Sequence, residues 1–173
     1  RWIAVPAPEL EKGTGYQIGA RPGKPRESWI WSPSLGWLRR IIGIHRTDAF
    51  MGSEFTYEDL TLAAPLERRS GEVGEVVEDG ERRIFLESSP YHYYGRVETY
   101  LDRAAGMPRR VVYFDRAGQR FREQRFLEIQ QIGDYLFPTV MEVEDELTGT
   151  TSRLVFSLVR FDVGIPPTLY TES

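Results

Sequence analysis

The sequence predicts a mainly β single domain built from an antiparallel sheet, and three observations support this. Apolar and polar residues alternate along most of the chain, as in half-buried strands. The alternating runs end at Gly and Pro and do not continue with helical spacing. Asp79-Gly80 and Thr148-Gly149 each separate two such runs, and Asp-Gly is typical of a two-residue hairpin turn. Several runs are long enough to curl a sheet around a central volume.

The alternating runs predict roughly ten strands. The last run is apolar on both faces over residues 154–159, which predicts a strand covered on both sides. In chain order, strands are expected over residues 2–5, after Gly13-x-Gly15, over 28–31 and 37–42, over 72–78 and 81–88, over 96–102, 109–115 and 121–132, and over 136–147 and 150–163.

Length and composition limit the classes to which the protein can belong. A chain of 173 residues is typical of one domain, here taken as 1–173. A net charge of −4 and an isoelectric point near 5.4 argue against a nucleic-acid partner. The chain has no Cys, so it has neither a disulfide framework nor a thiolate metal site.

Residues 50–60, the central segment, are neither a plain strand nor a plain turn. Large apolar side chains surround a Gly-Ser pair, so they either plug the core or form a lid over an apolar surface. Methionine and aromatic side chains suit a surface that repacks around varied apolar ligands. Ser53 is expected to cap a short helix that begins at Glu54, and Thr56 with Asp59 forms a second capping pair.

The sequence lacks a catalytic constellation, which predicts that the protein is not an enzyme. His45 and His92 are far apart, and neither has a partner at ligand spacing. No Gly-x-Ser-x-Gly elbow is present. No cofactor and no metal site are expected.

Carboxylates cluster late in the chain. Glu142, Glu144 and Glu146 share one face of a predicted strand, where they are either solvated or matched by the cross-strand Arg153 and Arg160.

An apolar cavity is the remaining candidate site. Trp29 and Trp31 share one face of their strand, where they are either core or an aromatic wall for an acyl chain. Burial of each methylene stabilises by roughly 0.8 kcal/mol, so a curved apolar sheet binds lipid without polar chemistry. The predicted lining is Trp29, Trp31, Leu38, Phe85, Val112, Phe114 and Phe156, with Phe50, Met51, Phe55 and Tyr57 at the mouth.

Four stretches carry a resemblance to a known family. The central segment reads Phe-Met-Gly-Ser-x-Phe-Thr-Tyr-Glu-Asp-Leu over residues 50–60. Before it come Pro-x-x-x-x-Gly-Thr-Gly at 8–15 and Trp-x-Pro at 31–33, and the chain closes with Val-Gly-Ile-Pro-x-x-Leu-Tyr-Thr at 163–171. Together with Arg-Arg at 39–40, these stretches resemble the outer-membrane lipoprotein-sorting family related to the periplasmic carriers LolA and LolB.

The resemblance implies a strongly curved, unclosed antiparallel half-barrel with short helical lid segments. Such carriers hold acyl chains of lipoproteins or lipids in transit through the periplasm, without enzymatic activity, metal or nucleotide. Relatives of this subgroup are associated with resistance-nodulation-type membrane exporters. The family domain begins with a helix and two strands that are missing before Arg1, as is any signal peptide. The bare edge at residues 2–5 is therefore expected to favour strand pairing with another copy.

A second hypothesis is an envelope interaction module that docks a membrane transporter or another partner. Its docking elements would be a sheet edge or the aromatic loop over residues 91–94. A hydrolase has no residues to support it.

Overall fold

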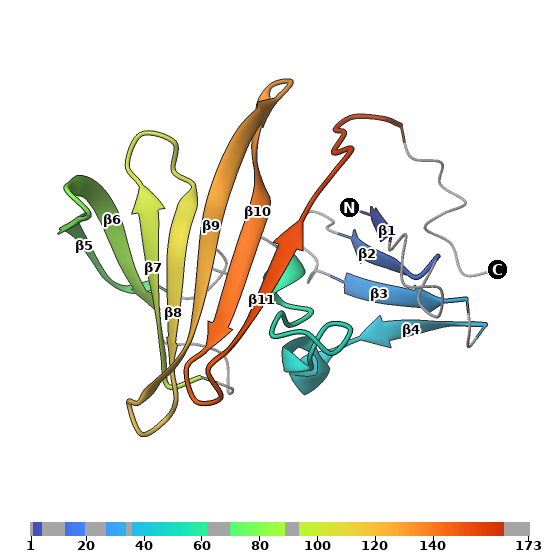
Figure 1. Ribbon diagram of the computed structural model, residues 1–173, viewed down its shortest axis with the longest axis horizontal. Helices are drawn as coiled ribbons and strands as arrows, with labels where there is room; N and C mark the ends of the chain where they lie inside the picture. Colours follow the sequence, from blue (N-terminus) through green and yellow to red (C-terminus); the bar gives the residue numbers. More distant parts are fainter. Residues whose placement is uncertain are drawn as a thin grey trace. The chain divides into compact units, whose positions relative to one another are not determined.

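The computed structural model describes residues 2–4, 13–19, 27–33, 36–61, 70–88 and 94–164 (Figure 1). The chain divides into two compact units. The N-terminal unit comprises Arg1–Asp48 with Pro166–Ser173, and the main unit comprises Ala49–Ile165. The aromatic loop at 91–93, with His92, and the closing stretch from residue 165 lie outside the described residues. A single domain over 1–173 stays a prediction.

The N-terminal unit holds a four-stranded antiparallel sheet in the order β1-β2-β3-β4. The strands over residues 27–32 and 37–41 form a hairpin, as the sequence predicts, and their register pairs Trp31 with Leu38. Tyr16, Ile18 and Ile41 are buried. The elements are β1 (Trp2–Ala4), β2 (Gly15–Gly19), β3 (Glu27–Ser32), β4 (Trp37–Ile41) and the short 3-10 helix η1 (Gly43–Thr47).

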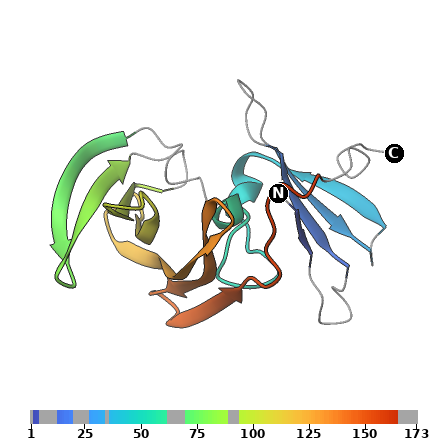
Figure 2. The ribbon, with the colours of Figure 1, turned by 90° about the horizontal axis from the view of Figure 1, so that it is seen from above.

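The main unit holds a seven-stranded sheet in the order β11-β10-β9-β8-β7-β6-β5, with every neighbouring pair antiparallel. The sheet is curved and stays open, because its outer strands do not pair with each other (Figure 2). The prediction of a mainly β, unclosed antiparallel fold is confirmed. The elements are the 3-10 helix η2 (Asp59–Thr61), β5 (Ser70–Glu78), β6 (Glu81–Ser88), β7 (Arg96–Asp102), β8 (Pro108–Phe114), β9 (Arg120–Ile132), β10 (Tyr135–Asp145) and β11 (Thr150–Val155).

The two faces of this sheet differ in chemistry. Residues directly opposite each other on neighbouring strands share a face, so the register sorts the side chains. The core face carries Val97, Val111 and Val143, all fully buried. The charged face carries arginines and carboxylates, among them Arg110 and Glu123, whose side chains lie 3.4 Å apart.

The last strand is shorter than predicted. It ends at Val155, and the prediction that residues 154–159 are covered on both sides is wrong, because Leu158 is 87% exposed. Leu158 and Asp162 both have a φ of 54°, a left-handed conformation that lies outside the extended β region. Two left-handed residues therefore interrupt the extended run.

The late carboxylates have other partners than expected. Glu142 and Glu144 pair with Arg125 of β9, at 3.6 and 3.3 Å, and Glu146 pairs with Arg120 at 2.5 Å. Matching by Arg153 or Arg160 is therefore a wrong prediction. The register places both Arg125 of β9 and Arg153 of β11 directly opposite Glu142, and the Arg125 side chain is the one that reaches the carboxylates.

Candidate ligand-binding site

The central segment opens with a tight turn of the main unit. The Ser53 N–H donates to the Phe50 carbonyl over 3.0 Å. The two residues between them, Met51 and Gly52, have φ values of 53° and 70°. Two central residues with positive φ are typical of a type I′ turn.

Met51 is an unusual residue for this conformation. The β5–β6 hairpin has the same backbone at Asp79 and Gly80, with φ values of 51° and 78°. Aspartate tolerates the left-handed region, but a methionine there is strained by about 1–2 kcal/mol. Because the backbone disfavours methionine at Met51, we infer that the residue serves through its side chain.

The second half of the segment is fixed by reciprocal capping. The Thr56 hydroxyl accepts from the Asp59 N–H at 3.3 Å, and Asp59 Oδ2 accepts from the Thr56 N–H at 2.7 Å. These bonds start η2 and confirm the predicted capping pair. The predicted Ser53 cap is wrong, because the Ser53 hydroxyl donates to the carbonyl of Phe50 and no helix begins at the next residue.

Asp59 also binds Arg122 of β9 through both carboxylate oxygens. The Tyr113 hydroxyl lies 3.2 Å from Asp59 Oδ1, and Arg122 donates a further bond to the Glu54 carbonyl at 3.1 Å. The side chains of Asp59 and Arg122 are only 2% and 6% exposed. A buried ion pair persists only when its remaining hydrogen-bonding groups are also satisfied, as they are here.

Electrostatics in this cluster follow from burial and charge. Burial opposes the charge of Arg122, but the Asp59 carboxylate outweighs it and raises the pKa of the guanidinium. Burial also raises the pKa of Tyr94, with Tyr113 and Asp59 adding to the effect. The rings of Tyr94 and Tyr113 lie 4.9 Å apart. The cluster thus keeps Arg122 charged and Tyr94 neutral.

A second anchor ties the segment to β11. The Glu54 N–H donates to the Ser152 hydroxyl at 3.0 Å, and the Thr150 hydroxyl donates to Glu54 Oε1 at 2.7 Å. The segment is therefore bound to β9 through Asp59 and to β11 through Glu54.

A pocket of about 220 Å³ opens between the central segment and β11. Drug-sized ligands occupy roughly 300–1,000 Å³, whereas an apolar cavity of about 150 Å³ accepts benzene. The pocket therefore fits the end of one acyl chain or one ring. It is lined by Phe50, Met51, Ser53, Phe55, Ser152, Arg153 and Leu154.

Three of the predicted site residues, Phe50, Met51 and Phe55, line this pocket together. Phe50 and Phe55 are buried, whereas Met51 is partly exposed. Tyr57 is also partly exposed and packs edge-on against Phe50, with ring centroids 5.6 Å apart. Phe50 and Phe55 are thus part of the core, and Met51 is the residue able to meet a ligand.

Other predicted site residues of the main unit lie elsewhere. Phe85, Val112 and Phe114 fall on the charged face, because the register places them opposite Tyr100, Glu123 and Arg96. Phe156 follows β11 and packs on Phe137 at 5.3 Å. The structure does not bring these four residues to the pocket.

The remaining three predicted residues belong to the N-terminal unit. Trp29, Trp31 and Leu38 share one face of its sheet, since Trp31 pairs with Leu38 and Trp29 pairs with Arg40. The Arg40 guanidinium lies 5.7 Å from the centre of the Trp29 ring. Trp31 and Leu38 are exposed. Their part in ligand binding stays a prediction.

Sequence reasoning missed Arg122, Ser152 and Leu154. Arg122 sits in the polar run Arg-Glu-Gln-Arg over 122–125, and nothing in that run marks which arginine is buried. Ser152 and Leu154 could have been found, because alternation places them on the face opposite Arg153.

A family model with the description "-like: Uncharacterized protein" matches residues 2–173. The chain belongs to this family. No curated protein matches the chain.

Three solved structures are similar to this chain along nearly its whole length. A domain from Vibrio parahaemolyticus, described as an outer membrane lipoprotein-sorting protein, matches with a TM-score of 0.83 at 26% identity, over 96% of this chain and 73% of that one. A DUF1329 family protein from Desulfovibrio piger matches with a TM-score of 0.83 at 24% identity, over 98% and 74%. A LolA superfamily protein from Nitrosomonas europaea matches with a TM-score of 0.70 at 18% identity, over 99% and 76%.

The chain therefore has a LolA-like fold, and the resemblance predicted from the sequence is confirmed. In the part of the chain that the structure describes, no group of three or more His, Cys, Asp or Glu side chains is arranged to hold a metal ion. Within those same residues, no helix has the length and hydrophobicity needed to span a bilayer.

Proposed function

We propose that the chain is a non-enzymatic carrier of the bacterial envelope that shelters an acyl chain of a lipid or lipoprotein in the pocket beside the central segment. The observation that carries this proposal is the likeness to the Vibrio lipoprotein-sorting domain along nearly the whole chain. The periplasmic location and the transport role come from the same likeness.

The pocket supplies the physical basis. Its aromatic and aliphatic lining favours an apolar ligand, and each buried methylene stabilises by roughly 0.8 kcal/mol. Five methylenes would contribute about 4 kcal/mol, or roughly a thousandfold in affinity. Met51, held in a strained backbone at the rim, is the adaptable wall of this pocket.

Two measurements test the proposal. Native mass spectrometry of gently purified protein should show co-purified lipid, and a fluorescent fatty acid should bind the emptied protein. Met51→Asp places a charge at the pocket rim and should weaken probe binding at least tenfold. Leu147→Asp is the matched control, because Leu147 is exposed in the β10–β11 turn and should leave binding unchanged.

Absence of both bound lipid and probe uptake would contradict the carrier proposal and favour an envelope docking module. Binding that Met51→Asp does not weaken would keep the carrier class and reject this pocket as the site.

A further inference from the structure

Residues 1–48 and residues 49–173 differ sharply in net charge. Residues 1–48 contain eight Lys or Arg and four Asp or Glu, a net charge of +4. Residues 49–173 contain 14 Lys or Arg and 22 Asp or Glu, a net charge of −8. The two parts add up to the net charge of −4 of the whole chain. All four tryptophans lie between residues 2 and 37. Basic and indole side chains are thus concentrated in the N-terminal part of an acidic protein.

Within the described part of the N-terminal unit, β4 carries three of these side chains, Trp37, Arg39 and Arg40. β4 is the last strand of its sheet, and residues 37–40 (Trp-Leu-Arg-Arg) are all exposed. Exposure continues past β4, where Ile42 and Ile44 are 54% and 63% exposed, and η1 has no buried residue. Residues 37–46 are called the β4 edge below.

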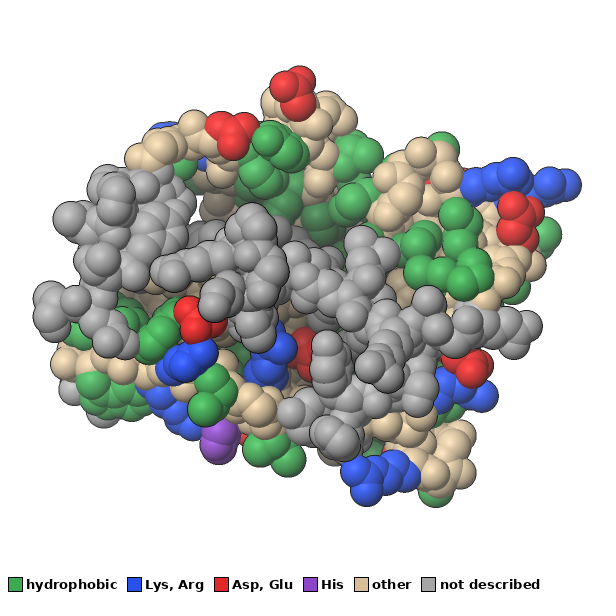
Figure 3. All heavy atoms as spheres, turned by 180° about the vertical axis from the view of Figure 1, so that it is seen from behind, with side chains coloured by type: hydrophobic (Ala, Val, Ile, Leu, Met, Phe, Trp, Pro, Cys, Tyr) green, Lys and Arg blue, Asp and Glu red, His purple; other side chains and the backbone are tan. Residues whose placement is uncertain are grey.

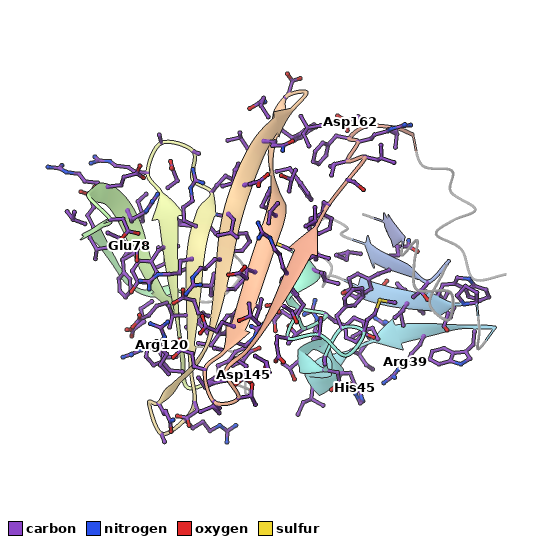
Figure 4. The ribbon with its side chains drawn as sticks, in the orientation of Figure 1. Arg39, His45, Glu78, Arg120, Asp145 and Asp162 are labelled. Carbon is purple, nitrogen blue, oxygen red and sulfur yellow. The ribbon has the colours of Figure 1, made fainter. Side chains whose placement is uncertain are left out.

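The unpaired charge on the β4 edge is positive. Arg40 is matched by Glu27, at 2.5 Å, and His45 by Asp48, at 2.9 Å. Arg39 and Arg46 form no ion pair with any residue that the structure describes. Arg39 projects from β4 on the side where His45 lies (Figure 4). Hydrophobic and basic side chains surround the histidine on the molecular surface (Figure 3).

We propose that the β4 edge docks the protein on an anionic lipid surface. Tryptophan and isoleucine side chains settle at the boundary between headgroups and acyl chains, where an indole keeps its N–H hydrated. Arginine stems lie along the apolar layer while their guanidiniums reach phosphate oxygens. The β4 edge offers both kinds of side chain side by side.

A membrane fits this edge better than a partner strand does. An outer strand could pair with another chain through its free N–H and carbonyl groups, but adjacent charged residues on an edge oppose such pairing. Arg39 and Arg40 are such a pair of adjacent charges. The positive charge of the unit also matches anionic headgroups, which attract each nearby Lys or Arg by enough to change affinity about fivefold.

The test uses the 173-residue chain and vesicles of phosphatidylcholine with 30% phosphatidylglycerol, against vesicles of phosphatidylcholine alone, at 50 mM salt. Flotation should recover the protein with the anionic vesicles, and tryptophan emission should shift to shorter wavelength. Arg39→Gln should weaken binding about fivefold. Arg82→Gln removes the same charge from an exposed position of the main unit and should have no effect.

Trp37→Ala provides a variant without a charge change, and it should reduce both flotation and the emission shift. Circular dichroism confirms that each variant is folded. The proposal is overturned if the protein ignores anionic vesicles, if Arg39→Gln and Arg82→Gln lose equal affinity, or if the β4 edge instead drives dimerisation without vesicle binding.

Discussion

The Asp59 carboxylate and the Arg122 guanidinium join the central segment to β9 through an ion pair that is almost completely buried. The pair lies between residues 63 positions apart in the chain. Its neighbours Tyr113 and Gln124 come from β8 and β9, and the Tyr113 hydroxyl lies within 3.3 Å of both Asp59 and Gln124. The central segment is therefore fastened to the sheet at Asp59, and its freedom to move as a lid is confined to the turn at Met51.

Replacing Asp59 with Asn should destabilise the protein by about 3–5 kcal/mol, because Arg122 would keep a buried charge without a counterion. The free energy of unfolding in urea measures the loss. Glu75→Gln is the control, since Glu75 and Arg103 are both more than half exposed and their pair should contribute under about 1 kcal/mol. Equal losses in the two variants would contradict a structural role for the buried pair.

Met51→Gly should separate stability from ligand binding. Glycine adopts the left-handed conformation at no steric cost, so the free energy of unfolding should stay level or rise by up to about 1 kcal/mol. Affinity for a fluorescent fatty acid should fall roughly tenfold, because the pocket loses the thioether wall. Titration and urea unfolding of one preparation measure both quantities.

Asp79→Gly is the matched control for this variant, since Asp79 has nearly the same backbone in a turn away from the pocket. It should leave fatty-acid affinity unchanged. A Met51→Gly protein that binds the probe normally would show that the side chain has no part in the site.

The strands could be predicted because they obey local rules. Alternation and the Asp79-Gly80 turn predict the β5–β6 hairpin, which the structure confirms with φ values of 51° and 78° at the turn. The end of β11 could not be predicted from hydrophobicity. Residues 154–159 are as apolar as a buried strand, yet Leu158 is 87% exposed and has a left-handed backbone, which hydrophobicity does not indicate.

The site was predictable only in part. The spacing of Thr56 and Asp59 predicts their local hydrogen bonds, because a capping box needs no tertiary contact. The ion pair between Asp59 and Arg122 is long-range. The sequence contains 20 arginines, and nothing in it indicates which of them pairs with Asp59. The face of the sheet on which a residue lies was still harder to predict. Phe85 and Val112 follow the expected alternation, yet their side chains lie on the charged face.

Glu123 should be a second stability centre, on the opposite face of the sheet. Its carboxylate is 3% exposed and accepts bonds from Arg110, Arg120 and Arg125. Glu123→Gln should cost about 2 kcal/mol in urea unfolding, because three guanidiniums would lose a shared buried acceptor while each keeps another carboxylate partner.

Glu144→Gln is the control for Glu123. Glu144 contacts Arg125 alone among the described ion pairs and is 37% exposed, so its loss should cost at most about 1 kcal/mol. High salt should keep the difference between the two variants or widen it slightly, since the exposed Glu144 pair is screened more than the buried Glu123 pairs. A Glu123→Gln protein as stable as Glu144→Gln would show that the other carboxylate partners of these arginines, such as Glu78 and Glu146, are sufficient.

Alkaline pH should weaken the fold through Tyr94. Burial raises its pKa above the ordinary value of 10.0, so the folded protein holds the phenol proton more tightly than the unfolded chain does. The contribution is complete below pH 10 and is lost as the pH rises, by about 1.4 kcal/mol per pH unit for one proton. The urea concentration at the unfolding midpoint, measured from about pH 8 to 11, should therefore decrease once the pH exceeds about 10. The Tyr94→Phe variant should show a smaller decrease.

Tyr135→Phe is the control and should change the slope less, because Tyr135 is exposed and its pKa is raised by its hydrogen bond to Asp162. If both variants keep the slope of the original protein, the alkaline loss arises from other groups and Tyr94 is not the sensor.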